Sequence, residues 1–258
     1  SARVRPAAAQ VPAPAAQVPA PAAQVRLPTP TPAEAPALDA SAFPASGAGR
    51  SLIVATGNDF VPFYSFSGSE PAGFDVDVAR ELASRLGKAD VEFRPGKGVR
   101  ARVSAGGADL GVAAISITAA RKRETLFSTP YQDSRFVVVA ASPLSRGDLA
   151  GATCSVWAAH ALYRGLLGKT GCAVDLRASH DEALAAVRGG QASFTVADEA
   201  FARTLSGPLR GTDVVLSTDT LGVAMQLGNT RLKRSVDAAL RAMEADGTLS
   251  RLRRRHSL

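Results

Sequence analysis

The feature that most constrains the fold of this chain is an alternation of short apolar runs with amphipathic helical patterns. The run "LIVATG" at 52–57 is typical of a buried strand. The segment "FDVDVARELASRLG" that follows places Val78, Leu82 and Leu86 on one helical face, and we expect Asp75 to cap this helix. Alternation of this kind predicts an α/β protein in which mostly parallel sheets are flanked by helices on both faces.

The same alternation starts again in the second half of the chain. Strand patterns at 153–157 and 192–197 lie on either side of a helix at 180–188, for which Ser179 and Glu182 are spaced as a capping box. Two α/β units in series imply two lobes. Because open sheets of this type bind ligands beyond the carboxyl ends of their strands, two facing lobes would form a binding cleft.

The first 49 residues have a different composition, with the repeat "AAQVPAPAAQVPAPAAQV". Frequent proline removes backbone donors and favours extended structure, so we interpret residues 1–49 as a disordered Pro/Ala-rich spacer and expect globular structure from Arg50. No hydrophobic signal region is visible after Ser1, which is compatible with a signal peptide that has been removed. The longest apolar runs are far shorter than the roughly 20 residues of a membrane helix.

The chain is basic, with 30 Lys and Arg against 23 Asp and Glu, and part of the excess lies in the C-terminal "RLRRRHSL". Such charge can attract nucleic acid. Here no recognition helix, zinc-ligand spacing or interleaving of aromatic and basic residues accompanies it. We therefore interpret the C-terminus as a solvated tail and predict no nucleic-acid partner.

Cys154 and Cys172 are the only cysteines. Each precedes a β-like run, "SVW" or "AVDL", so the two can lie at neighbouring strand ends within reach of a disulfide, which would imply an oxidising compartment. Two buried free thiols are the alternative. None of the three histidines has a ligand spacing relative to the cysteines, so we predict neither a metal site nor a cofactor.

Five segments in order resemble the amino-acid-type extracellular solute-binding proteins of bacterial ABC transporters. They are "LIVATGNDFVPF", "AGFDVDVARELASRLG", "GGADLGVAAISITAARKRETLFSTPY", "QASFTVADEAFA" and "ALRAMEADGTLSRL". The resemblance covers nearly all of 51–252 and implies a two-lobed, periplasmic-binding-protein-like (Venus-flytrap) fold. It implies these parts: lobe 1 from 50–138 plus 220–258, lobe 2 from 139–219, and a two-strand hinge near 136–140 and 216–224.

The resemblance also points to Arg121, which follows Ser116 and Thr118 where the family places an arginine that grips the ligand's α-carboxylate. The physical logic agrees, because Thr118 can cap a helix and a guanidinium in its first turn can pair with a carboxylate in a bidentate manner. Ser116 would add a hydroxyl contact. For Lys122 and Arg123 we expect a solvated helix face, which is the alternative for Arg121 as well.

Two further positions match ligand contacts of the family. Phe60 corresponds to an aromatic residue that stacks on the ligand, although it can instead fill the rim of lobe 1. Asp198 corresponds to an acidic residue of lobe 2 that pairs with the ligand's ammonium group, and a dipolar amino acid would then bridge Asp198 and Arg121 across the cleft. The alternative for Asp198 is a helix N-cap.

The chain departs from the family pattern at three places, one of which is the absence of a second aromatic expected near "RPGKG". Ala113 and Ala114 stand where many relatives carry a hydroxyl or a glycine, so one donor to the carboxylate is missing. The loop after the first strand of lobe 2 is shortened to "VWAAHALY", which brings Trp157 and His160 near the place of an anion-contacting loop. We therefore add Trp157 and His160 to the ligand-binding candidates and expect a pocket that differs from the ordinary amino-acid pocket.

What the resemblance implies is a periplasmic or extracellular binding protein rather than an enzyme. Such a protein captures a small amino-acid-like or carboxylate-bearing solute and delivers it to an ABC permease of the inner membrane. We expect a monomer, either free or tethered to the membrane through its N-terminal spacer. One alternative is a binding module with an altered ligand, such as a sensor or an accessory to another periplasmic protein. Another is an enzyme like cyclohexadienyl dehydratase, although no catalytic constellation is readable.

Overall fold

The computed structural model describes residue 38 and residues 40–68 and 70–258. These described residues belong to one compact unit, and the description below concerns them. The expected disordered spacer therefore lies largely outside the described residues. Within the described ranges, no helix is long and apolar enough to cross a membrane.

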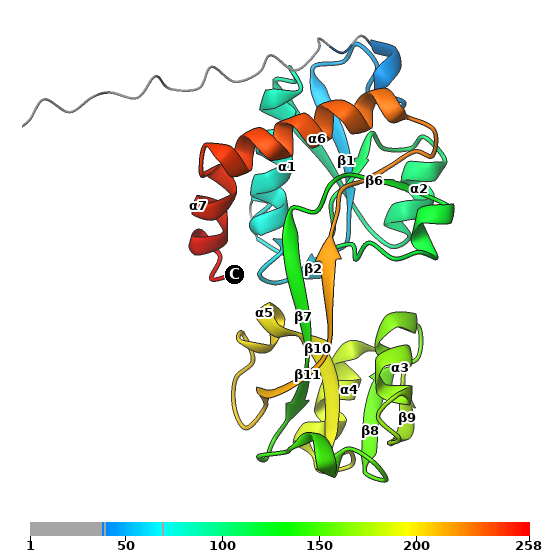
Figure 1. Ribbon diagram of the computed structural model, residues 1–258, viewed down its shortest axis with the longest axis vertical. Coiled ribbons are helices and arrows are strands. Elements are labelled where there is room, and N and C mark those ends of the chain that lie inside the picture. Colours follow the sequence, from blue (N-terminus) through cyan, green and yellow to red (C-terminus); the bar gives the residue numbers. More distant parts are fainter. Residues whose placement is uncertain (1–37, 39, 69) are drawn as a thin grey trace, which may run out of the picture. The chain divides into compact units, whose positions relative to one another are not determined.

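The first sheet, which contains the strands labelled β1 and β6 in Figure 1, has the strand order β4-β1-β5-β12-β6. In β1 (Ser51–Thr56) five of six residues are buried, because the strand lies between two parallel neighbours, β4 (Asp90–Pro95) and β5 (Leu110–Gly111). Antiparallel β12 (Ala224–Met225) and β6 (Leu126–Phe127) complete the sheet. Helices α1 (Phe74–Arg85) and α2 (Val99–Ser104) pack on it, and α6 (Thr230–Ala245) and α7 (Thr248–Arg255) pack on α1.

The second sheet has the order β11-β7-β10-β8-β9. Parallel pairing joins β10 (Phe194–Asp198), β8 (Thr153–Trp157) and β9 (Ala173–Arg177), while β7 (Gln132–Ala140) and β11 (Arg210–Leu221) are antiparallel. Helices α3 (Ala161–Gly168), α4 (His180–Arg188) and α5 (Glu199–Ala202) pack against this sheet. The remaining short elements are η1 (Ala40–Ala42), β2 (Asp59–Phe60), β3 (Tyr64–Ser65), η2 (Arg121–Arg123) and η3 (Arg146–Asp148).

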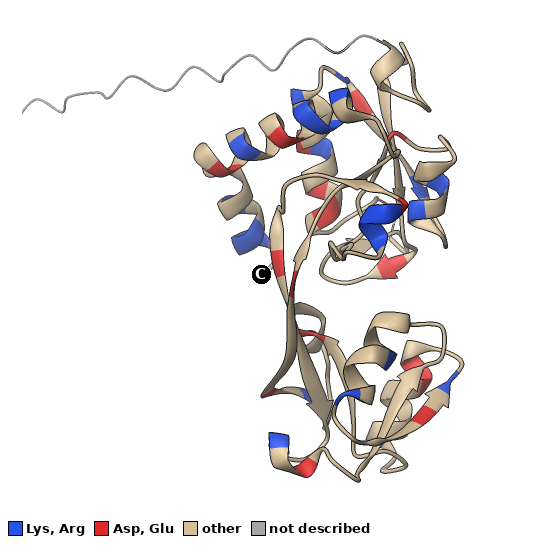
Figure 2. Cartoon of the chain, turned by 45° about the vertical axis from the view of Figure 1, so that its right-hand side comes forward, with Lys and Arg blue, Asp and Glu red and all other residues tan. Residues whose placement is uncertain are grey.

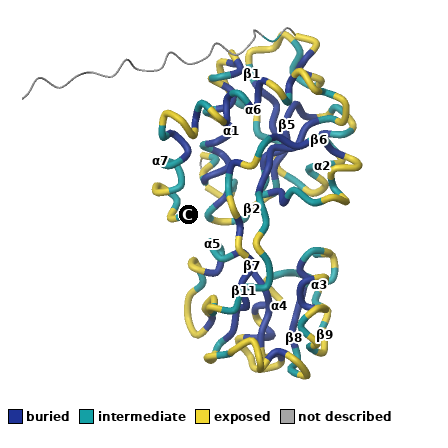
Figure 3. Tube along the Cα trace, in the orientation of Figure 1, coloured by how far each residue is buried: buried dark blue, intermediate teal, exposed yellow. Residues whose placement is uncertain are grey.

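Two sheets, each flanked by helices, confirm the predicted two-lobed α/β class. The strands β7 and β11 connect the lobes: Leu221 pairs with Gln132 at one end, and Arg210 pairs with Ala140 at the other. Buried residues form separate cores around the two sheets (Figure 3). Residues 136–138 pack in the cores of the second sheet, although the predicted boundary places them in lobe 1. The lobe boundaries stay a prediction.

The structured part of the chain begins earlier than the expected Arg50. Ala42 and Phe43 are buried in the core of the first lobe, and the Lys88 ammonium lies 4.0 Å from the centre of the Phe43 ring. The same ammonium donates to the carbonyl oxygens of Gly47 and Gly49, each at 2.8 Å. Sequence reasoning missed this segment because its partners lie some 40 residues further along the chain.

The C-terminus is not the solvated tail that its charge suggested. Arginines do line α6 and α7 (Figure 2), but α7 is held against the first lobe by specific contacts. Arg253 Nη2 donates to the Tyr131 carbonyl at 2.8 Å, and Arg253 Nε donates to Gln132 Oε1 at 3.0 Å. Leu249 is buried in the core of this lobe.

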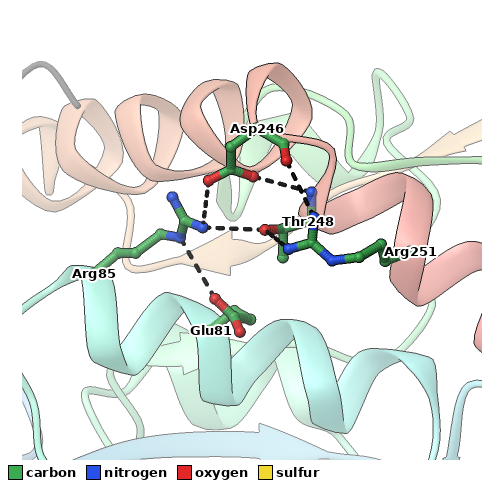
Figure 4. Close-up of polar contacts among 5 residues, drawn as sticks. All are labelled: Glu81, Arg85, Asp246, Thr248 and Arg251. Carbon is green, nitrogen blue, oxygen red and sulfur yellow. Dashed lines mark hydrogen bonds and ion pairs between the residues drawn. The ribbon is translucent and has the colours of Figure 1, made fainter. Parts of the chain in front are cut away.

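A second set of contacts joins α7 to α1 through the turn that ends α6 (Figure 4). Arg85 Nη2 donates to Asp246 Oδ2 at 2.8 Å and to Thr248 Oγ1 at 3.3 Å, and Arg251 Nη2 donates to the same Thr248 oxygen at 2.7 Å. Hydrogen bonds from Thr248 and Arg85 lower the pKa of Asp246 to about 2. The C-terminal helix is thus part of the first lobe.

Cys154 and Cys172 form a disulfide, as predicted, with their Cα atoms 5.9 Å apart. Cys154 is on β8, and Cys172 immediately precedes β9, the parallel neighbour of β8. The pairing follows from the sheet, because Thr153 pairs with Ala173 and Cys154 with Val174, which brings both cysteines to the same end of the two strands.

Candidate functional site

A cavity of about 580 Å³ is lined by residues of both lobes. It lies where β-strand ends and the helices that follow them meet, as expected for open α/β sheets. All six residues predicted to bind ligand line this cavity: Phe60, Ser116, Arg121, Trp157, His160 and Asp198. The structure therefore brings together residues that are up to 138 positions apart in the sequence, the difference between 198 and 60.

Arg121 projects into the cavity from η2, whereas its neighbours Lys122 and Arg123 are exposed. Its Nη1 donates to the Ser116 carbonyl at 2.9 Å, and its backbone N–H donates to Thr118 Oγ1 at 3.2 Å. Thr118 thus accepts from the first N–H of a single 3₁₀ turn of three residues, whose N-cap is Ala120, and does not cap a helix as we expected. Burial lowers the pKa of Arg121, but a guanidinium remains cationic at neutral pH.

The loop that carries Ala113 and Ala114 is held by a buried carboxylate. Ala114 has φ 46°, in the left-handed region that a non-glycine residue rarely adopts. Its N–H donates to Asp75 Oδ2 at 2.6 Å, and the Tyr131 hydroxyl donates to Asp75 Oδ1 at 2.8 Å. Asp75 therefore does not cap α1 as predicted, since the N-cap is Gly73. Its role is to fix the loop that leads to Ser116.

Asp75 makes the stability of this lobe depend on pH. Burial raises its pKa from 3.8 to about 7, against the opposing effect of the two hydrogen bonds. A raised folded-state pKa means that the stabilisation is complete below about pH 4 and is lost as pH rises through about 7.

We therefore expect the unfolding free energy of the wild-type protein to fall by roughly 2–4 kcal/mol between about pH 4 and pH 7. This fall is measured relative to the Asp75→Asn variant, which has no carboxyl group to titrate at this position. Urea unfolding of both proteins at a series of pH values measures the difference. A constant offset between the two curves would contradict this assignment.

Asp198 lines the cavity and is also the helix N-cap that was its alternative role. Its Oδ1 accepts from the Ala200 N–H at 2.8 Å, so it caps α5, and its Oδ2 accepts from the Ser134 hydroxyl. The side chain is buried, and burial raises its pKa while these hydrogen bonds oppose the shift. Because both oxygens are engaged within the protein, less of the carboxylate is left for a ligand's ammonium group than the prediction supposed.

Aromatic and imidazole rings form a continuous series along the cavity. Phe60 of the first lobe is stacked between Phe63, at 5.4 Å between ring centres, and Phe201 of the second lobe, at 5.6 Å. Phe63 is buried in the core. The ring of Phe60 thus lines the cavity and contacts a ring of the other lobe.

Trp157 and His160 form part of the opposite wall. The His160 ring stacks on Tyr163 at 3.7 Å and meets the Trp157 ring edge-on at 6.0 Å. Its Nδ1 accepts from the Tyr163 N–H at 3.3 Å, so His160 is also the N-cap of α3. Burial lowers the pKa of His160 from 6.5 to about 4, with help from His180 and Arg121, and the ring is neutral at pH 7.

Sequence reasoning missed several residues of the cavity, above all His180, Phe201 and Tyr163. The rule that ligands bind at the carboxyl ends of parallel strands could have found all three. Tyr163 lies in the helix that follows β8, His180 begins the helix that follows β9, and Phe201 lies in the helix that follows β10. In the part of the chain that the structure describes, no group of three or more His, Cys, Asp or Glu residues could hold a metal ion.

Comparisons with known proteins agree with this architecture. The L-cystine-binding protein TcyJ of Escherichia coli (strain K12) is 28% identical over 216 residues, which cover 78% of this chain and 80% of that protein. The crystal structure of the ancestral amino acid-binding protein AncCDT-1, a precursor of cyclohexadienyl dehydratase, has a TM-score of 0.71 at 26% identity. That match covers 80% of this chain and 95% of the other.

A second solved structure is that of an ancestral arginine-binding protein bound to arginine, with a TM-score of 0.70 at 26% identity. The match covers 80% of this chain and 98% of the arginine-binding protein's chain. The family model for bacterial extracellular solute-binding proteins, family 3, matches residues 52–257. This range contains both lobes and every residue of the cavity. The protein is therefore a solute-binding protein and belongs to the bacterial extracellular solute-binding proteins, family 3.

Proposed function

We propose that this protein captures a small carboxylate-bearing solute of the amino-acid class between its lobes and delivers it to an ABC permease. The observation that carries the proposal is the Arg121 guanidinium in a cavity shared by the two lobes. Among the described residues, its one hydrogen-bond partner is the Ser116 carbonyl, so further N–H donors can meet a ligand carboxylate. Ser116 itself is buried in the cavity wall.

The lobes are joined by only two strands, β7 and β11, and this supports a capture mechanism in which they move relative to each other. A ligand that contacts both walls stabilises the arrangement in which both contacts exist, so its affinity shifts the population of that arrangement. The membership in an extracellular family and the disulfide support a location in the periplasm or outside the cell. The permease would then recognise the ligand-bound arrangement.

Isothermal titration of the purified protein with each of the standard L-amino acids, and with their decarboxylated amines, tests this function. We expect at least one amino acid to bind with a dissociation constant in the micromolar range or below, and its decarboxylated amine to bind at least about 100-fold more weakly, a loss of about 2.7 kcal/mol. If no amino acid binds, or if the amine binds as tightly, the proposal is wrong.

A further inference from the structure

The wall of the cavity on the second lobe contains two imidazoles on either side of one tyrosine. The Tyr163 ring is stacked on His160 at 3.7 Å and tilted against His180 at 5.7 Å. The His180 ring also lies 5.3 Å from Phe201, which stacks on Phe60 of the first lobe. All five rings line the cavity. This part of the cavity lining is therefore aromatic and includes the nitrogens of two imidazoles.

Both imidazoles are neutral at pH 7, since burial lowers the pKa of each. A neutral imidazole has one nitrogen that donates and one that accepts. In His160, Nδ1 accepts from the Tyr163 N–H, so the proton resides on Nε2. The pair thus provides hydrogen-bonding groups without adding charge to the cavity.

His180 Nε2 is buried and has no hydrogen-bond partner in the described part of the protein. Buried polar atoms are hydrogen-bonded in the great majority of cases, and an unpaired one costs roughly 1–3 kcal/mol. Because this ring lines the cavity, a bound solute can supply the missing partner.

The carboxylates that line the cavity offer little to a cationic side chain. Asp198 is engaged by Ser134 and by the start of α5. Asp59 and Asp181 are exposed at its edge, where water screens a charge. Arg121 also lines the cavity, and its positive charge repels a cationic ligand side chain. An uncharged side chain fits this environment better than a lysine or arginine side chain does.

We propose that His180 determines specificity by hydrogen-bonding through Nε2 to a polar group on the uncharged side chain of the bound amino acid. The ligand class is an L-amino acid whose side chain bears an amide, hydroxyl or ring nitrogen and packs against Phe60 and Phe201. This inference rests on the proposed function, because the carboxylate on Arg121 sets the position of the side chain.

The test compares the wild-type protein with His180→Phe and His180→Asn by isothermal titration against four groups of L-amino acids. The groups have side chains that are uncharged and polar (glutamine, asparagine, tyrosine, histidine), apolar (leucine, phenylalanine), cationic (arginine, lysine) and anionic (glutamate). The phenylalanine variant keeps a ring between Tyr163 and Phe201 but removes the nitrogen. His256→Phe, outside the cavity, is the matched control for loss of a histidine.

We expect an uncharged polar amino acid to bind most tightly to the wild type. His180→Phe should weaken its binding at least 10-fold while leaving leucine or phenylalanine within about 3-fold. His180→Asn should recover part of the loss, and His256→Phe should change nothing. Tightest binding of arginine or lysine, or an unchanged polar-to-apolar ratio in His180→Phe, would overturn the role of His180 and leave the capture of amino acids intact. Failure of every amino acid to bind would overturn both proposals.

Discussion

Replacing Arg121 by alanine is expected to abolish solute binding. The guanidinium is half-buried in the cavity and can make two parallel hydrogen bonds to a carboxylate, the strongest contact that this lining offers to an anion. Removing it leaves the carboxylate unpaired in a desolvated site, which weakens binding by roughly 2–5 kcal/mol. This corresponds to a dissociation constant that is about 30-fold to several thousand-fold larger, and isothermal titration measures it directly.

Two further variants test whether the loss of binding is caused by the planar guanidinium of Arg121 and not by the loss of any positive charge. Arg121→Lys keeps the charge but not the planar pair of donors, so we expect it to recover only part of the affinity. Arg123→Ala removes an exposed arginine two positions along the same turn and should leave binding unchanged. If Arg121→Ala binds as well as the wild type, then Arg121 belongs to a solvated surface, and the site must hold its ligand by other groups.

The largest expected effect on stability comes from Asp109→Ala. The Asp109 carboxylate is fully buried and accepts three backbone N–H groups, from Ala45 and Ser46 on Oδ1 and from Ile53 on Oδ2, at 2.9–3.0 Å. Alanine would leave these three donors without a partner, and the positive charge of Lys88 would lose its nearby counter-charge. An unpaired buried donor costs roughly 1–3 kcal/mol, and the Ala45 and Ser46 donors are only partly buried, so we expect a total loss of about 3–6 kcal/mol.

Urea unfolding at neutral pH measures this loss. Asp109→Asn keeps the shape and one acceptor oxygen, so it should retain part of the stability. Asp213→Ala removes an exposed carboxylate of β11 and should change the unfolding free energy by no more than about 0.5 kcal/mol. A loss below about 1 kcal/mol for Asp109→Ala would show that the segment 42–49 contributes little to the folded lobe.

The positions and buried faces of the helices could be predicted because they depend on residues that are close together in the sequence. Val78 and Leu82 on α1, and Leu232 and Val236 on α6, are buried as their four-residue spacing predicts. The cap of α4 is also local, since Ser179 Oγ accepts from the Glu182 N–H three positions away. The apolar run from Ala108 to Ile117 favours one long strand, but β5 ends at Gly111 and Ala114 has a left-handed φ.

The six predicted ligand contacts lie together because the order of strands and helices specifies which chain segments end at the cleft. Their partners were not predictable in this way. Asp198 also accepts from Ser134, 64 positions away, and Phe60 meets Phe201 only when the two lobes are folded and adjacent. The sequence alone also gave no sign of the buried nitrogen of His180, because burial depends on the rings that surround it.

By itself, then, the sequence determined the two α/β lobes, the helical stripes and the position of Arg121, since each follows from short-range periodicity or from motifs in order. The tertiary structure alone decided that Asp75 holds the loop before Ser116 and not the start of α1. Its two partners, Ala114 and Tyr131, are 39 and 56 positions away. A buried carboxylate takes whichever donors the fold brings to it, and no local pattern encodes which donors those are.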